Sequence, residues 1–201
     1  MTATDLLVLH ALRCGGYAGL ARLAAVTGLD ESEVESELID LAVAGLVTRM
    51  SGEFNAWGLT DAGLEADAER ITEELDSAGA RATVLALYRR FLELNPELLE
   101  LCAAWQLRPV DGVMTVNDHG DPSYDARVLD RFSDLDSRAA IVCGELSTVL
   151  PRFGRYRTRL AGALDRAAAG ELEFLTDNTA AYHTVWAVLH EDLLSTLGIP
   201  R

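Results

Sequence analysis

The chain has 201 residues, of which 49% are hydrophobic, so it is long enough to bury a sizeable core in one or two domains. All seventeen basic residues are arginine, and the formal net charge of -15 argues against a general nucleic-acid coat and against an anionic membrane surface. The three cysteines are dispersed, no basic leader opens the sequence, and no apolar run approaches the roughly 20 residues that span a bilayer. We therefore expect a cytoplasmic protein with no membrane contact.

The first part of the chain predicts three helices in close succession. Residues 5–13 form a strongly apolar helix, in which His10 is most simply a core or dimer-face histidine. A short helix follows from residue 20, and Gly28 in the next turn is free to adopt a positive φ. Asp30 can cap the third helix, and Glu33, three residues on, completes a capping box.

A small hairpin and a fourth helix come next. Gly45 ends the third helix, and residues 46–60 predict two strands joined by a turn at 51–55. Asp61 then caps a helix that reaches about residue 76. We expect the apolar face of this helix to consist of Leu64, Ala68, Ile71 and Leu75.

This order of elements resembles the winged helix-turn-helix domain of the MarR-type bacterial regulators over about residues 5–75. The segments that carry the resemblance are Leu20-Ala21-Arg22-Leu23-Ala24, Thr27-Gly28-Leu29, Leu41 to Arg49, and Leu59-Thr60-Asp61-Ala62-Gly63. The last segment is similar to the LT-x-x-G that follows the wing in that family. The resemblance implies a winged-helix domain over residues 1–76, a regulatory function and a homodimer, although a fold does not fix an activity.

Residues 77–201 predict an all-helical domain, so the whole protein is expected to be mainly α with a small β-hairpin wing. Asn95-Pro96 marks a kink or a new helix start within the first of these helices. The segment 107–122 has no helical period and is expected to be a long loop. The predicted helices cover residues 80–106, 123–133, 134–150, 152–169 and 179–197.

The predicted recognition helix, residues 31–44, is a poor match to DNA. DNA affinity depends mainly on neutralising phosphates, and bases are usually contacted by Arg, Lys, Asn or Gln. The wing tip carries Glu53 and no cation, where the wing of the MarR family normally carries Arg. The exposed positions of the helix are Glu31, Ser32, Glu33, Glu35, Ser36, Glu37 and Asp40.

Two interpretations of this domain therefore stay open. In the first, the protein is a transcriptional regulator whose helical domain senses a small molecule. In the second, the winged helix has lost DNA binding and serves as a protein-interaction or ligand-binding module. If DNA is bound, the residues expected to contact it are Arg22, Ser32, Ser36 and Arg49.

Polar and aromatic side chains in the second half predict a pocket for an anionic or aromatic small molecule. They come from the 105–125 loop, the 152–159 helix face and the 182–191 helix face. Aromatic walls with a few convergent polar groups are typical of such pockets, and guanidinium groups bind carboxylates through two contacts. The predicted ligand-binding residues are Trp105, Gln106, Asn117, His119, Tyr124, Arg152, Tyr156, Arg159, Tyr182, His183, Trp186 and His190.

Other functions of these residues are possible. The arginines could instead pair with Asp118, Asp121 and Asp125 and close the loop as a structural cluster. We predict no metal and no cofactor, because two histidines seven residues apart on one helix lie about 10 Å apart along its axis, too far to share a zinc ion. An enzyme is the third alternative, because a loop histidine beside a carboxylate could act in acid–base catalysis. The sequence contains no nucleophile or phosphate-binding motif, and we assign no catalytic residue.

Apolar helices at both ends of the chain predict a homodimer. MarR-like proteins dimerise through helices that flank the wing domain. The surface expected to do so here includes Leu6, Leu9 and the stretch 80–105.

Overall fold

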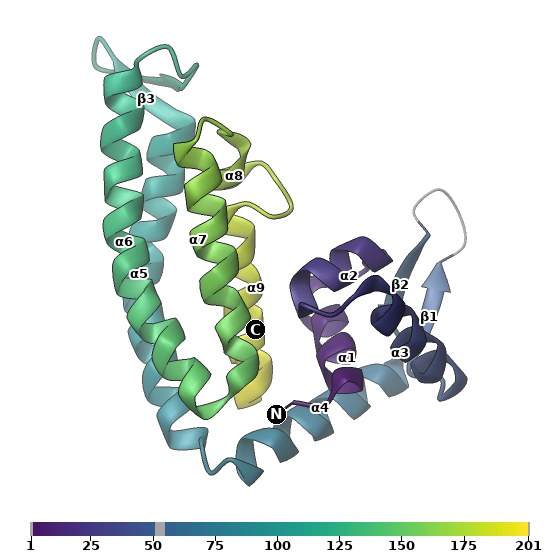
Figure 1. Ribbon diagram of the computed structural model, residues 1–201. Coiled ribbons are helices and arrows are strands. Elements are labelled where there is room, and N and C mark those ends of the chain that lie inside the picture. The colour runs from purple at the N-terminus through teal and green to yellow at the C-terminus, as the bar shows by residue number, and fades with distance from the viewer. Residues whose placement is uncertain (1, 51–54, 201) are drawn as a thin grey trace.

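The computed structural model describes residues 2–50 and 55–200 and is mainly helical (Figure 1). Most of the predicted turn at 51–55, including Glu53, lies outside the described residues. No helix in the described part of the chain is long and apolar enough to cross a membrane.

The described part of the N-terminal unit contains four helices and one hairpin. Its elements are α1 (Thr4–Gly15), α2 (Leu20–Thr27), α3 (Glu31–Val43), β1 (Val47–Met50), β2 (Ala56–Leu59) and α4 (Asp61–Ser77). Strand β1 pairs antiparallel with β2, and Ala18 adds a bridge to Trp57. Leu9, Leu23 and Leu38 are fully buried where the first three helices meet.

Local signals in this unit are confirmed. Gly28 ends α2 in the left-handed region with φ +79, which a side chain would strain. Asp30 and Glu33 form the expected capping box at the start of α3. The N-terminal third of the fold thus follows from turn and cap chemistry that the sequence displays openly.

The prediction for α4 was wrong in two details. Thr60, rather than Asp61, caps the helix, and its hydroxyl accepts a hydrogen bond from the Gly63 N–H at 3.0 Å. Ile71 and Leu75 are buried as predicted, but in the first half of the helix the buried side is shifted by one position, so that Leu64 is 42% exposed while Asp67 is 1% exposed. The buried residues of α4 are Gly63, Asp67, Ile71 and Leu75.

The C-terminal unit is a helical bundle with a hairpin at one end (Figure 1). Its core joins aromatic and aliphatic side chains from four long helices, including Phe91, Phe132, Tyr156 and Trp186. The elements are α5 (Arg81–Gln106), β3 (Leu107–Val110), β4 (Val113–Val116), α6 (Pro122–Val149), η1 (Pro151–Phe153), α7 (Gly154–Ala168), α8 (Glu173–Thr176) and α9 (Tyr182–Leu197).

The structure corrects three expectations here. The predicted loop contains the antiparallel β3–β4 hairpin, so the domain is not all-helical. Helix α6 is one helix with no break at residue 134, since neither Gly nor Pro interrupts it before Gly144. Helix α5 covers nearly the whole predicted stretch 80–106, and no new helix starts at Pro96. Helix α9 begins at Tyr182, a few residues later than predicted.

Helix α4 connects the two units, and the N-terminal unit packs along it beside the bundle (Figure 1). Helices α1 and α4 both contact α9, so the units meet through side chains as well as through the chain connection. Leu6 and Leu9, predicted on a dimer surface, are instead buried within the chain's own fold, with exposures of 8% and 0%. A dimer, if formed, has to use other residues.

Candidate functional site

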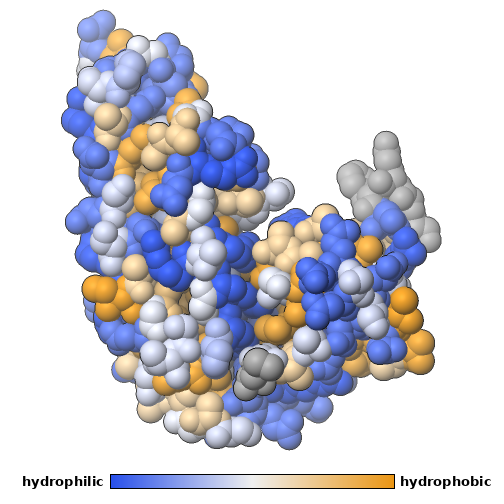
Figure 2. All heavy atoms as spheres, viewed as in Figure 1, coloured by the Kyte–Doolittle hydropathy of each residue, from blue (hydrophilic) through white to orange (hydrophobic). Residues whose placement is uncertain are grey.

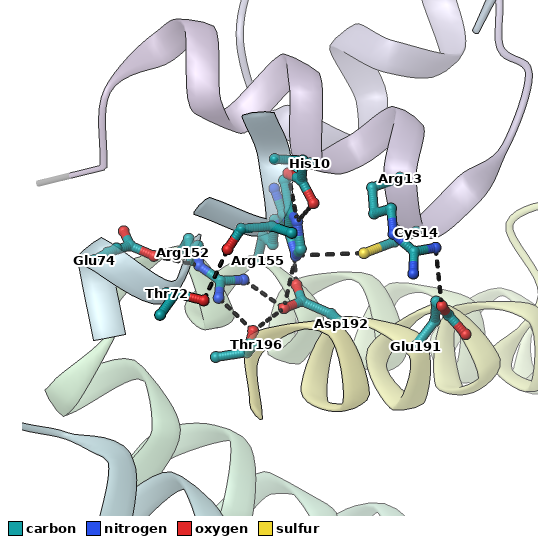
Figure 3. A network of polar contacts seen from close by, with 12 residues as sticks. His10, Arg13, Cys14, Thr72, Glu74, Arg152, Arg155, Glu191, Asp192 and Thr196 are labelled. Atoms are coloured by element: carbon teal, nitrogen blue, oxygen red, sulfur yellow. Dashed lines mark hydrogen bonds and ion pairs between the residues drawn. The ribbon is translucent and has the colours of Figure 1, made fainter. Parts of the chain in front are cut away.

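A buried polar network lies where α1, α4, α7 and α9 meet (Figure 3). The imidazole of His10 bridges two carboxylates: its Nδ1 lies 3.0 Å from Asp67 Oδ1, and its Nε2 lies 3.1 Å from Asp192 Oδ1. Asp192 also accepts hydrogen bonds from the Arg152 guanidinium and, at 2.8 Å, from the Tyr156 hydroxyl. All these side chains are at least nine-tenths buried.

The network is electrically balanced. Arg152 also bonds Glu74, and Arg155 Nη2 lies 3.2 Å from Asp192 Oδ2. Burial alone would lower the pKa of His10, but Cys14, Asp192 and Asp67 raise it well above its ordinary value. Burial likewise opposes ionisation of Asp192, yet Arg152 and His10 hold its pKa well below the usual range. Three cations therefore face three carboxylates. Because each charge in this buried cluster has a partner of opposite sign, we interpret the cluster as structural.

One part of the network could in principle hold a metal ion. Donor atoms of His10, Cys14 and Asp192 all lie within 4.8 Å of one another. Asp192 is already saturated by hydrogen bonds, and the Arg152 guanidinium lies against it. Burial also raises the pKa of the Cys14 thiol, which disfavours the thiolate that binds metals. These residues therefore fit a metal poorly.

A cleft opens beside this network, between α2 of the N-terminal unit and α7 of the bundle. Its outer part has a volume of about 470 Å³, with Ala25 and Val26 on one side and Ala163, Phe174 and Val185 on the other. Figure 2 shows the surface hollowed between the bundle and the N-terminal unit.

An inner pocket of about 20 Å³, enough for one water molecule, continues from the outer cleft toward Cys14 and Tyr156. Arg22, Val26 and Arg159 border both the cleft and the pocket. The cleft and the pocket thus adjoin, and both have walls from the two units.

Cations without acidic partners border this cleft. No carboxylate among the described residues pairs with Arg22 on α2 or with Arg159 on α7. Burial lowers the pKa of the Arg159 guanidinium, and the nearby Arg155 and Arg22 lower it further although Tyr156 opposes them. Arg155 Nε and Nη1 are buried without a hydrogen-bond partner. In a chain of net charge -15, this is a local excess of positive charge.

At the outer end of the cleft, Arg166 is already partnered. It bonds Glu171 and lies over the Phe174 ring at 3.5 Å. The charges without an acidic partner are therefore those of Arg22 and Arg159, and the two unbonded nitrogens of Arg155 line the same inner pocket. Such a site suits an anion that carries an apolar group.

The twelve residues predicted to bind a ligand do not converge on one pocket. Only Tyr156 and Arg159 border the cleft, and Arg152 belongs to the buried network. No hydrogen bond, ion pair or ring contact between described residues joins His119 or Tyr124 to these three. The alternative in which the arginines pair with Asp118, Asp121 and Asp125 is also wrong, since Arg152 pairs with Asp192 and Glu74, and Arg155 pairs with Asp192.

The predicted residues of the 105–125 segment form a closed cluster at the base of the β3–β4 hairpin. The Asn117 amide donates to the Trp105 carbonyl at 3.0 Å and to Asp125 Oδ1 at 2.8 Å. His119 Nδ1 lies 2.9 Å from Asp125 Oδ2, and its ring lies 4.7 Å from that of Trp105. Gln106 is exposed beside the cluster. These contacts fix the hairpin to the bundle and leave no described cavity between them.

The predicted residues of α9 lie in the bundle core or at its edge. The Tyr182 hydroxyl bonds Asp136 at 3.1 Å, and Trp186 Nε1 donates to Asn95 at 3.0 Å. The His190 ring lies 5.4 Å from Phe91, and His183 is half-buried. They pack the bundle and do not line the cleft.

The predicted DNA contacts lie on a different surface from most of the cleft. Ser32 and Ser36 are exposed on α3 among acidic residues. Arg49 on β1 bonds Asn55 at 2.7 Å and lies 5.6 Å from the Trp57 ring centre. Arg22 lies between this surface and the cleft, since it borders both.

Sequence reasoning missed the acidic residues that complete the buried network. Asp192 lies one helical turn from Leu189 and directly precedes Leu193, both buried, and Asp67 falls one helical turn from Ile71 on the inward side of α4. Carboxylates at core positions of two helices, together with His10 in an apolar helix, indicated a buried ion-pair cluster. Arg155 belongs to the 152–159 helix face that the sequence indicated, but the α2 side of the cleft gave no local signal.

No protein-family model matches this chain, and neither a curated protein nor a solved structure matches it. Function therefore has to be inferred from the chemistry of the chain itself.

Proposed function

We propose that this protein is a ligand-responsive regulator, with a winged helix-turn-helix unit in the N-terminal part and a small anionic molecule bound between that unit and the bundle. One observation carries the proposal: Arg22 on α2 and Arg159 on α7 border the same cleft, and neither has an acidic partner among the described residues. Placement in the cytoplasm belongs to the same proposal, because the cysteines of the described chain are unpaired.

The cleft limits the kind of ligand. A volume of about 470 Å³ falls within the range of about 300–1,000 Å³ typical of small-molecule sites. The arginines supply a place for a carboxylate or another oxyanion, and Val26, Phe174 and Val185 contact a hydrocarbon or aromatic body. The ligand is therefore expected to be an amphipathic anion rather than a sugar or a cation.

The position of the cleft gives the ligand a means of regulation. A molecule that contacts both α2 and α7 stabilises the arrangement in which these helices lie side by side. Helix α2 packs directly on α3 and on α1, so a change at α2 is transmitted to the surface that α3 exposes. Ligand binding is thereby coupled to whatever α3 recognises.

Thermal denaturation with defined probes tests this function. We expect benzoate and hexanoate to raise the melting temperature by about 5 °C or more at about 100-fold excess over Kd, and benzamide and hexanol to leave it unchanged. Arg159→Gln should abolish the shift, because it removes the uncompensated charge. Arg131→Gln, an exposed arginine on α6, is the matched control and should retain it.

The proposal is contradicted if neutral probes stabilise the protein as well as the anions do. It also fails if Arg159→Gln folds normally and keeps the full response.

A second candidate function concerns α3. Its solvent face carries Glu31, Glu35 and Asp40 and no basic residue, and it exposes Ile39 by 53% and Val43 by 85%. An acidic surface with exposed apolar side chains favours a protein partner over a phosphate backbone. In this alternative the winged helix is a protein-interaction module, and the ligand cleft is kept.

A further inference from the structure

The β3–β4 hairpin exposes almost all of its apolar side chains. Met114 is 59% exposed, Val113 63% and Val116 78%, and Leu107 and Val110 are each 38% exposed. The hairpin lies at the far end of α5 and α6, away from the N-terminal unit (Figure 1). An isolated two-stranded hairpin is marginally stable in water, so its order here depends on its attachment to the bundle.

The attachment is rigid. The buried Asn117–Asp125 contact and the Trp105–His119 ring contact hold the base of the hairpin. At its tip, Asp111 and Gly112 both have positive φ, +51 and +82, as a two-residue hairpin turn requires. The strands are thus presented in a fixed geometry rather than left loose.

The outer edge of β3 is closed. The Leu107 N–H donates to the Ala103 carbonyl, and the Leu107 carbonyl lies 3.0 Å from the Tyr124 hydroxyl. Pro109, the next residue whose backbone faces outward, has no N–H to offer. Proline and satisfied end groups are the means by which proteins protect a sheet edge from pairing.

The outer edge of β4 has no such protection. The Asn117 N–H donates to the Gln106 carbonyl at 2.8 Å, which makes this a hydrogen-bonded pair of the ladder. Because such pairs alternate along antiparallel strands, Met114 and Val116 direct their N–H and C=O groups away from β3. The sheet has only two strands, and within the described chain no other backbone group bonds this edge.

We infer that the open edge of β4 pairs antiparallel with β4 of a second copy of this chain. With the two-fold axis beside Thr115, Met114 of each copy lies opposite Val116 of the other, and every open N–H and C=O of these two residues finds a partner. The pairing is self-complementary, as a closed dimer requires. It joins apolar side chains to apolar side chains.

Charge also favours a second copy at this edge. Strand β4, Val-Met-Thr-Val, contains no charged residue in a chain of net charge -15. It is therefore a place where two copies can approach with little repulsion. The contact is small, so we expect a weak dimer, because interfaces below about 1,200 Å² are typical of transient complexes.

Cysteine cross-linking tests the register. Thr115→Cys places the two sulfurs across the axis at a non-hydrogen-bonded position, where Cα atoms lie about 4.5 Å apart and a disulfide can form. We expect mild oxidation to convert most of this variant into a disulfide-linked dimer. Val113→Cys is the matched control: it is on the same face and is exposed, but lies opposite Asn117 of the second copy, so it should stay monomeric on a non-reducing gel.

Sedimentation tests the edge without cysteines. At about 100 μM we expect the wild-type protein to sediment largely at twice the mass of one chain, which a Kd of about 10 μM or tighter would give. Met114→Pro should be monomeric, because it removes an outward N–H directly opposite Pro109, and Met114→Leu should still dimerise. Far-ultraviolet circular dichroism checks that both variants fold.

Three results would overturn the inference. These are a monomeric wild-type protein at that concentration, a dimer that survives in folded Met114→Pro, or equal cross-linking of Thr115→Cys and Val113→Cys. None of these measurements depends on a ligand in the cleft.

Discussion

At the scale of single residues, His10 shows how burial and charge compete. Its ring is 1% exposed, and burial by itself favours the neutral imidazole. Two carboxylates within 3.1 Å of its ring nitrogens reverse this preference and keep it charged. Since Asp67 belongs to α4 and Asp192 to α9, one protonated ring on α1 links two helices of the N-terminal unit to a helix of the bundle.

This arrangement predicts how stability depends on pH. Because the pKa of His10 is raised above 6.5 in the folded state, its contribution is fully present below 6.5 and is lost as the pH rises through the folded value. We therefore expect the melting temperature of the wild-type protein to fall as the pH is raised above about 6.5. Thermal denaturation of His10→Gln should lack this fall, although the variant is less stable overall.

His183→Gln provides the comparison, because His183 is only half-buried and makes no hydrogen bond within the described chain. It should keep the wild-type pH slope. Parallel slopes for wild type and His10→Gln would show that the histidine is not charged in the fold.

At the scale of elements, the sequence predicted what local chemistry determines. Features that depend on residues close together in the chain were predicted: the capping box at Asp30, the turn at Gly28 and the hairpin over 46–60. The structure contains the capping box, the turn and both strands of the hairpin. The length of α6 and the β3–β4 hairpin were missed. The hairpin signal was Asp111-Gly112 between two apolar runs, a pair typical of tight β-turns.

The candidate site was less accessible from the sequence, for a physical reason. Tyr156 and Arg159 were found because aromatic and guanidinium groups at helical spacing are visible on one helix. The facing wall comes from α2, more than a hundred residues away in the chain, and nothing local indicates that Arg22 faces Arg159. The hairpin cluster and the cleft were merged into one pocket because the sequence gives no distance between helix faces.

Gly63 of the LT-x-x-G segment offers a prediction at this scale. A Cβ added at Gly63 would lie 1.9 Å from the Leu46 carbonyl oxygen, so α4 and the start of β1 would have to separate. We expect Gly63→Ala to destabilise the protein by about 2–4 kcal/mol, as overpacking against the backbone does. Urea denaturation of purified variants measures this.

Gly144→Ala is the opposite case. Gly144 lies inside α6 with nothing within 4 Å of an added Cβ, so alanine should stabilise by about 0.5–1 kcal/mol. If Gly63→Ala is as well tolerated as Gly144→Ala, the close approach of α4 to Leu46 is not present in solution.

At the scale of the whole molecule, charge decides what α3 can contact. The net charge is -15, and the exposed face of α3 carries acidic residues and no basic one, while Arg22 and Arg159 lie in the cleft. Long-range repulsion therefore opposes any encounter with a DNA backbone. A DNA-binding regulator with this charge distribution would have to recognise a specific DNA sequence, with Arg22 and Arg49 as the cations expected to contact it.

This gives opposite expectations for the two interpretations of α3. Purified protein is mixed with genomic fragments at low salt, and the bound fragments are sequenced. If the protein is a DNA-binding regulator, a palindrome is enriched among the bound fragments. This enrichment should be lost in Arg49→Ala, at a residue outside the cleft, and retained in the control Arg131→Ala. Replacing Glu31, Glu35 and Asp40 by Gln, Gln and Asn should then strengthen binding to fragments without the palindrome, since phosphate repulsion is removed. If low salt yields no enrichment and the neutralised variant also fails to bind, α3 is not a DNA-recognition helix, and its acidic, partly apolar face belongs to a protein partner.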